Sequence, residues 1–486
     1  MASVREETFR GIKWGLIQKC TMQPVQFLYG IILARLITPG EMGILGLTAI
    51  FFAIAGQLQN CGFGLALIRK QNRTNEDICT VFWFNVAMSF ILSSCLYLAA
   101  PWFVWFFNQP ALLNLTRVSA LLMFLGSTGS VHWTLYTARR DFKTPAIVSM
   151  CTTLVAMPFT IWAAFTGWSY WAPMLQGIIS GLLGLITVWI ISPWKPRFIF
   201  SWASFRSFFS FGSKLVITGI SSALYDNMKS LFIGRMYSPV DLGLYNRAWS
   251  LAHMPRSTIN GLITSVSYPI LATLQNDNQQ LWSVYSKYIR TTSLIIFFIS
   301  STLIALARPV ISCLYGNNWI PCAPYVQLIL TGAMCCHFCE INGNLLMVKG
   351  RSDAILKLDI IQKVVSVMLI VPACFHSVMA MCWASVCFVP FGILSNAYFT
   401  KHFFGVSLWQ QLKSFLPYLV MAIIANIPGY LLTHTEAHPI LQIMLGGILA
   451  LIIYLALLII TQDSAYIILK EIALSKLPRF AKKMIL

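Results

Sequence analysis

The sequence is poor in charged residues. Asp, Glu, Lys and Arg make up 10% of its 486 residues, whereas hydrophobic residues make up 57%. An ordinary soluble domain carries about 25% charged residues, so a soluble fold of this length would lack the polar side chains to cover its surface. This shortage excludes a water-soluble enzyme, a secreted disulfide scaffold and a disordered chain.

Long polar loops and nucleotide-binding motifs are missing as well. The sequence contains no G-x-x-x-x-G-K-[ST] phosphate loop and no H-E-x-x-H, so the chain is not expected to hydrolyse ATP by itself or to act as a zinc protease. A membrane glycosyltransferase or polymerase needs a sizeable loop outside the membrane to hold its acceptor and a catalytic acid or base. We therefore expect a transporter, not an enzyme, with no catalytic residues and no bound metal.

Apolar runs of about 20 residues dominate what is present, and this is the length that a helix needs to cross about 30 Å of hydrocarbon. The pattern predicts an all-α polytopic membrane protein with about fourteen transmembrane helices. The predicted spans are 14–36, 43–66, 79–101, 112–135, 145–166, 170–192, 210–235, 243–268, 292–312, 323–347, 354–374, 377–399, 412–433 and 439–461.

The basic residues gather on one side of the predicted membrane. The chain has 34 Lys and Arg against 15 Asp and Glu, a net charge of +19. The predicted outer loops 102–111, 167–169, 313–322 and 375–377 contain no Lys or Arg, which is the asymmetry typical of cytoplasmic and external loops. We therefore expect a multi-pass protein of the bacterial inner membrane with both termini in the cytoplasm, no cleavable signal peptide and no nucleic-acid partner.

An internal repeat is the strongest signal. Residues 31–45 align without a gap with residues 231–245, so that the Pro ends one helix, the acid begins the next and the Gly permits close packing. The recurring pairs are Arg35 and Arg235, Thr38 and Ser238, Pro39 and Pro239, Glu41 and Asp241, and Gly43 and Gly243. Six spans separate the copies, which predicts two six-helix lobes in parallel orientation.

The repeat also predicts the domain organisation. We expect an N-terminal lobe over 1–200, with spans one to six, and a C-terminal lobe over 201–402, with spans seven to twelve. Residues 403–486 hold spans thirteen and fourteen and a basic cytoplasmic tail. These two spans form an extra groove or brace the second lobe, and the sequence favours neither role.

Polar side chains form stripes on the first helices of each lobe. Because a charged residue at mid-membrane is costly without a partner or a wet cavity, we expect the stripes to line a central cavity for a hydroxyl-rich anionic solute. For single amides and hydroxyls the alternative is a hydrogen-bonded seam between helices. The expected substrate-binding residues are Lys19, Gln23, Gln26, Asn60, Lys229, Arg247, His253, Arg256 and Asn260.

A second polar cluster predicts a site that couples transport to H⁺ or Na⁺. It comprises Glu340 on span ten with Asp359 and Lys363 on span eleven, and Asp226 is the other candidate carboxylate. The alternative is a Glu340 to Lys363 ion pair.

Three other features of the sequence concern structural roles, and one of them is undecided. Arg35 and Arg235 are expected to clamp the two turns. The C-x-x-C spacing at Cys336 is expected to serve packing, and a Cys313 to Cys322 disulfide is left open.

Several motifs along the chain occur together in one known family. They are residues 33–39 through Gly43, 62–64, 66–70, Phe82 with Asn85, 139–142, 244–246, Pro255, Pro269, 316–319 and 350–351. Together they resemble the polysaccharide transporter branch of the multidrug, oligosaccharidyl-lipid and polysaccharide (MOP) exporter superfamily, most closely the Wzx-type flippases. The resemblance implies a two-lobed helical bundle that moves undecaprenyl-pyrophosphate-linked oligosaccharide from the cytoplasmic to the periplasmic leaflet. At Asn60 the chain departs from relatives that carry an acid.

The resulting hypothesis is a flippase that works by alternating access in the export of surface polysaccharide. Its expected partners are the lipid-linked oligosaccharide, the bilayer, and a polysaccharide polymerase with its export machinery; no cofactor is expected beyond a coupling ion. A drug or cation exporter of the same fold is the first alternative and predicts a cavity dominated by acids and aromatics. A membrane glycosyltransferase or polymerase is the second.

Overall fold

A computed structural model describes residues 2–60, 62–273 and 277–461, and within these ranges every regular element is a helix. The prediction of an all-α polytopic membrane fold is confirmed. The chain divides into two compact units, Met1–Gly243 (unit 1) and Leu244–Leu486 (unit 2).

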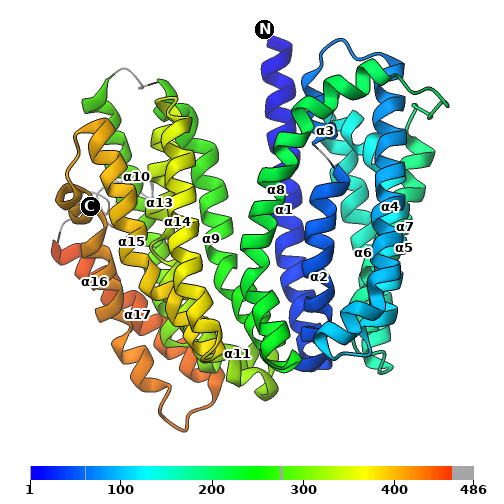
Figure 1. Ribbon diagram of the computed structural model, residues 1–486. Helices are drawn as coiled ribbons and strands as arrows, with labels where there is room; N and C mark the ends of the chain where they lie inside the picture. The colour runs from blue at the N-terminus through cyan, green and yellow to red at the C-terminus, as the bar shows by residue number, and fades with distance from the viewer. Residues whose placement is uncertain (1, 61, 274–276, 462–486) are drawn as a thin grey trace, which may run out of the picture. The chain divides into compact units, whose positions relative to one another are not determined.

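Unit 1 contains eight helices and the first turn of a ninth (Figure 1). Within it, α4 packs against α5, α5 against α7, and α6 against both α1 and α7. The helices are α1 (Ala2–Leu36), α2 (Pro39–Asn60), α3 (Phe63–Arg69), α4 (Asn75–Phe107), α5 (Leu112–Ala138), α6 (Lys143–Phe165), α7 (Trp171–Ile191) and α8 (Trp202–Met236).

Unit 2 holds the rest of α9 and the helices that follow. An apolar core lies where α10 and α16 pack together, with α17 against α16 and α13 against α10. The elements are α9 (Pro239–Thr273), α10 (Asn278–Ala305), α11 (Ala307–Tyr315), η1 (Asn317–Cys322), α12 (Ala323–Ala333), α13 (Cys336–Val348), α14 (Ser352–Cys374), α15 (Val378–Phe404), α16 (Leu408–Leu432) and α17 (Pro439–Thr461).

Fewer helices than the fourteen expected are apolar enough to cross a membrane by themselves. In the described part of the chain ten pass on length and composition, and α8 makes an eleventh if its two segments, bent by 49°, count as one span. Three long helices do not pass: α1, α9 and α14, with 35, 35 and 23 residues. These three helices carry most of the predicted polar stripes, so the residues that point to a cavity also lower their hydropathy.

The helix that carries the start of the second copy of the repeat packs inside unit 1. Helix α8 contacts α2, α3 and α4, so contacts divide the chain after α8. The boundaries at 200 and 402 follow the duplication of the sequence, and they stay a prediction.

Candidate functional site

The two copies of the repeated turn adopt the same local structure. In the first, the Thr38 N–H and hydroxyl both donate to Glu41 Oε2, at 2.8 and 2.9 Å. In the second, the Ser238 N–H and hydroxyl both donate to Asp241 Oδ2, at 3.1 and 2.6 Å. Each acid therefore caps the helix that it begins, as the repeat predicts.

The glycines of the two turns touch each other reciprocally. A Cβ added at Gly43 would lie 1.7 Å from the Pro239 carbonyl oxygen, and one added at Gly243 would lie 1.8 Å from the Pro39 carbonyl oxygen. Because both obstacles are backbone atoms, no side-chain rotation relieves either clash. The repeated Gly is therefore required by a helix contact that is nearly symmetric, and the expected close packing is confirmed.

The arginine of the second turn is held by a neighbouring helix end. The Arg235 guanidinium donates to the Phe106 carbonyl oxygen at 2.6 Å and lies 4.8 Å from the Phe106 ring centroid. These contacts join the end of α8 to the end of α4, which is the clamping role expected of Arg235.

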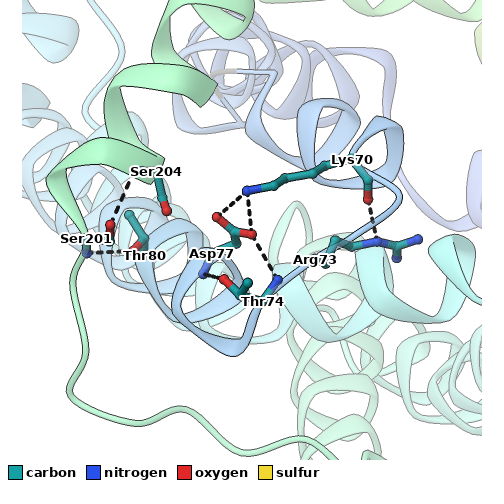
Figure 2. A network of polar contacts seen from close by, with 7 residues as sticks. All are labelled: Lys70, Arg73, Thr74, Asp77, Thr80, Ser201 and Ser204. Carbon is teal, nitrogen blue, oxygen red and sulfur yellow. Dashed lines mark hydrogen bonds and ion pairs between the residues drawn. The ribbon is translucent and has the colours of Figure 1, made fainter.

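A buried carboxylate organises the start of α4 (Figure 2). Asp77 is 1% exposed, and Lys70 Nζ lies 2.7 Å from its Oδ2. Asp77 Oδ2 accepts from the Thr74 N–H at 2.9 Å, while the Asp77 N–H donates to Thr74 Oγ1 at 3.2 Å. Thr74 and Asp77 stand three residues apart before an apolar run, which is the sequence signal for this capping box.

The same end of α4 also fastens the connector that leads into α8. The Ser201 N–H donates to Thr80 Oγ1 at 2.9 Å, as Figure 2 shows. The indole N–H of Trp83 donates to the Arg197 carbonyl oxygen at 2.8 Å. The first turns of α4 therefore fix where α8 begins, which explains why α8 packs inside unit 1.

The predicted stripe residues of unit 1 lie on α1 and α8. Lys19 and Gln26 are exposed, Gln23 is half-buried, and Lys229 is half-buried among its neighbours. Asp226 is exposed and occupies the position in α8 that Gln26 has in α1, at the repeat offset of 200. Polar and charged side chains therefore emerge in the middle of helices of membrane length.

Two predicted site residues of unit 2, Arg247 and His253, contact aromatic side chains of the same unit. The Arg247 guanidinium lies 4.8 Å from the Tyr315 ring centroid and 5.1 Å from that of Trp319, so α9 is held against α11 and η1 by cation–π contacts. His253 stacks on Trp249, with ring centroids 3.6 Å apart. The side chains of Asn60, Arg256 and Asn260 lie outside the described residues. No contact tests the binding assignment, which stays a prediction.

Two of the candidate coupling residues are paired with each other on α14. Lys363 Nζ pairs with Asp359 Oδ2 at 2.8 Å on the exposed side of α14, and Glu340 is half-buried on α13. Asp226 belongs to unit 1. The coupling assignment stays a prediction as well.

In the cysteine and histidine motif of α13, both ring nitrogens of His337 form hydrogen bonds. His337 Nδ1 lies 2.7 Å from the Met334 carbonyl oxygen, so this nitrogen carries the proton, and Nε2 accepts from the Ser293 hydroxyl at 2.8 Å. Cys313 and Cys322 are not joined by a disulfide. In the described part of the chain no three His, Cys, Asp or Glu side chains are placed to hold a metal ion.

Sequence reasoning missed two cavities inside unit 1. The first, here called the glycine cavity, has a volume of about 630 Å³ and lies between α1, α5, α6 and α7. The second, here called the amide cavity, has a volume of about 610 Å³ and lies between α2, α3, α4, α5 and α8. Trp133 and Thr137 of α5 line both. The glycines of α5 and α7 were the one available signal, but glycines in membrane helices more often mark close packing.

These features define a polytopic helical membrane protein with a duplicated turn and polar side chains at mid-helix. A solved structure described as the lipid II flippase MurJ, in an inward closed conformation, shares the fold with a TM-score of 0.70 over 95% of this chain and 99% of that chain, at 13% identity.

The sequence comparisons then give the family. Residues 32–324 match the family model described as polysaccharide biosynthesis protein, and the chain belongs to this family. It is 23% identical to the succinoglycan biosynthesis transport protein ExoT of Rhizobium meliloti over 97% of both chains. It is 24% identical to the lipopolysaccharide biosynthesis protein WzxC of Escherichia coli over 74% of this chain and 73% of that protein. The resemblance to polysaccharide exporters is confirmed.

Proposed function

We propose that the chain is a flippase that moves polyprenyl-pyrophosphate-linked oligosaccharide repeat units from the cytoplasmic to the periplasmic leaflet of the bacterial inner membrane. The family match and relatives named for polysaccharide transport support a transporter, not an enzyme. The observation that carries the proposal is the exposure of Lys19, Gln26 and Asp226 in the middle of α1 and α8. Such side chains are too costly to face lipid, so they face a wet path for a polar headgroup.

The basic side chains of this path suit the pyrophosphate. Lys19 and Lys229 form charge-assisted hydrogen bonds with phosphate oxygens, and Arg256 is the third candidate. The amides and hydroxyls of the stripes bind sugar, and the polyprenyl tail stays in lipid. The cycle is coupled to H⁺ or Na⁺ through Asp226, Glu340, Asp359 and Lys363, both termini are cytoplasmic, and a polymerase receives the flipped repeat unit.

Deletion of the protein in its own host tests this function. We expect lipid-linked repeat units to accumulate on the inner leaflet and surface polysaccharide to be lost. Accumulation on the outer leaflet would instead indicate a polymerase. Drug sensitivity without accumulation would indicate a drug or cation exporter.

Charge reversal then tests the headgroup path. We expect Lys19→Glu or Lys229→Glu to fail to restore export in the deletion strain although the variants reach the membrane at normal levels. Lys13→Glu, near the start of the same helix α1 and also exposed, is the matched control and should restore it. Full export by both stripe variants would overturn the pyrophosphate assignment.

A further inference from the structure

The amide cavity of unit 1 has an unusual lining for the interior of a membrane protein. Of the residues that the structure describes, none that lines it is charged. One large aromatic ring, that of Trp133, lies among amides, hydroxyls, glycines and the aliphatic side chains of Leu65, Ile68, Leu215 and Val216. The polar side chains that the argument uses are Gln57, Asn85, Ser130, Thr134 and Ser222.

Among the described residues of this lining, Asn85 has a buried side-chain oxygen that accepts no hydrogen bond. It is 5% exposed, and its Nδ2 donates to Ser130 Oγ at 3.4 Å. Its carbonyl oxygen Oδ1 is buried and accepts no hydrogen bond from any residue that the structure describes. The Ser130 hydroxyl cannot fill this role, because it donates to the Ser127 carbonyl oxygen at 2.8 Å. A buried acceptor without a partner is rare and marks a place where a donor is missing.

The hydroxyls of α5 leave the cavity short of donors for the same reason. Thr134 Oγ1 donates to the Ser130 carbonyl oxygen at 3.0 Å, and Thr137 Oγ1 donates to the Trp133 carbonyl oxygen at 3.2 Å. Their oxygens keep acceptor capacity, since a hydroxyl donates once and accepts up to twice. The cavity wall therefore offers acceptors to a molecule that brings its own O–H groups.

The acceptors that the lining offers indicate the chemistry of a ligand that would fit the amide cavity. A phosphate brings negative charge and is bound most strongly by cations, and no described residue of the lining is charged. An acyl chain brings no O–H group. A sugar ring brings several hydroxyls that donate to amide and hydroxyl oxygens, and its apolar C–H face packs on an aromatic ring. The volume of about 610 Å³ lies within the range of about 300 to 1,000 Å³ of small-ligand sites.

We propose that the amide cavity binds a sugar residue of the transported oligosaccharide, with Asn85 Oδ1 accepting a sugar hydroxyl and Trp133 packing on the ring. The inference rests on the proposed function, because the sugar is part of the lipid-linked cargo. It separates recognition of the two ends of the headgroup: the sugar is bound inside unit 1 by neutral groups, and the pyrophosphate is bound by the lysines of the stripes.

Binding of neutral sugars to the purified full-length protein in nanodiscs tests the site directly. The probes are methyl glucoside, methyl galactoside and methyl N-acetylglucosaminide, and saturation-transfer NMR reports which of them contacts the protein. We expect transfer to at least one glycoside. Asn85→Leu keeps four side-chain heavy atoms branched at Cγ but removes the acceptor, and it should weaken that binding about five- to tenfold. Trp133→Leu should abolish the transfer to the C–H face.

Ser93→Ala is the matched control. Ser93 lies on the same helix as Asn85, is 7% exposed, and its hydroxyl has no partner among the described residues, but it does not line the amide cavity. It should bind the glycosides like the unchanged protein. Gln57→Leu, at an exposed position, gives a second test of the cavity should Asn85→Leu not fold, and we expect it to weaken binding as well.

Measuring export in cells distinguishes a failure of the sugar site from a failure of the proposed flippase function. If the unchanged protein fails to relieve inner-leaflet accumulation in the deletion strain, the flippase function itself has failed. If it relieves accumulation and Asn85→Leu does so equally well while binding glycosides normally, only the sugar site is overturned. A rise in thermal midpoint with NaCl, absent in Asn85→Leu and unmatched by any glycoside, would assign the cavity to a cation and would also overturn it.

Discussion

Two regions of unit 1 use glycine for opposite reasons. At the repeated turns, a Cβ on Gly43 or Gly243 would overlap a backbone carbonyl oxygen. In the glycine cavity, a Cβ on Gly177 or Gly181 would meet no atom within 4 Å. The first pair lets two helix ends touch, and the second pair keeps volume open. The comparison shows that a small residue in a membrane helix identifies neither close packing nor a cavity until the neighbouring atoms are known.

The largest expected effect is at the turns. Gly43→Ala or Gly243→Ala places a methyl group against a fixed carbonyl, and overpacking of this kind costs about 3 kcal/mol of unfolding free energy. We expect a markedly lower thermal midpoint, measured by size-exclusion chromatography of heated samples in detergent. Gly40→Ala is the control in the same turn, since its Cβ would meet only the Val240 Cγ2 atom, at 3.3 Å. A normal midpoint for Gly43→Ala would show that the turns separate without cost.

A smaller effect is expected from the acids that cap the same turns. Glu41→Ala and Asp241→Ala each remove a capping side chain, which costs about 1 kcal/mol. The loss should be larger for Glu41, because its Oε1 also accepts a hydrogen bond from the Ser169 hydroxyl, whereas for Asp241 only the bonds with Ser238 are shown. The same thermal assay ranks the two variants. Equal midpoints would mean that the Ser169 contact contributes nothing.

The smallest effect, and one of opposite sign, is expected in the glycine cavity. Gly177→Ala and Gly181→Ala meet no obstacle, and Ala is favoured over Gly within a helix by about 0.5 to 1 kcal/mol. We expect a slightly higher thermal midpoint. Gly129→Ala, in the same cavity but 3.1 Å from the Leu185 Cδ1 atom, should gain less. Destabilisation by Gly177→Ala would show that the cavity closes against α7 in the membrane.

The sequence predicted the features that depend on near neighbours along the chain. Helix positions follow from apolar runs, and the repeat places an acid, Glu41 or Asp241, at the start of the helix after each turn. It also placed Asn85 in the motif shared with polysaccharide exporters. It could not predict that Asn85 lacks a donor, because Ser130 and Ser127 lie more than forty residues away along the chain and their hydrogen bonds are set by packing.

What the sequence determined by itself is a helical membrane protein with a duplicated, capped turn, since span length, proline, acid and glycine act within one or two helical turns. Tertiary structure alone decided that α8 packs against α2, α3 and α4, that Gly43 meets Pro239, and that the glycine cavity and the amide cavity remain beside α5. Each of these depends on atoms brought together from distant parts of the chain, and periodicity within a single helix carries no information about them.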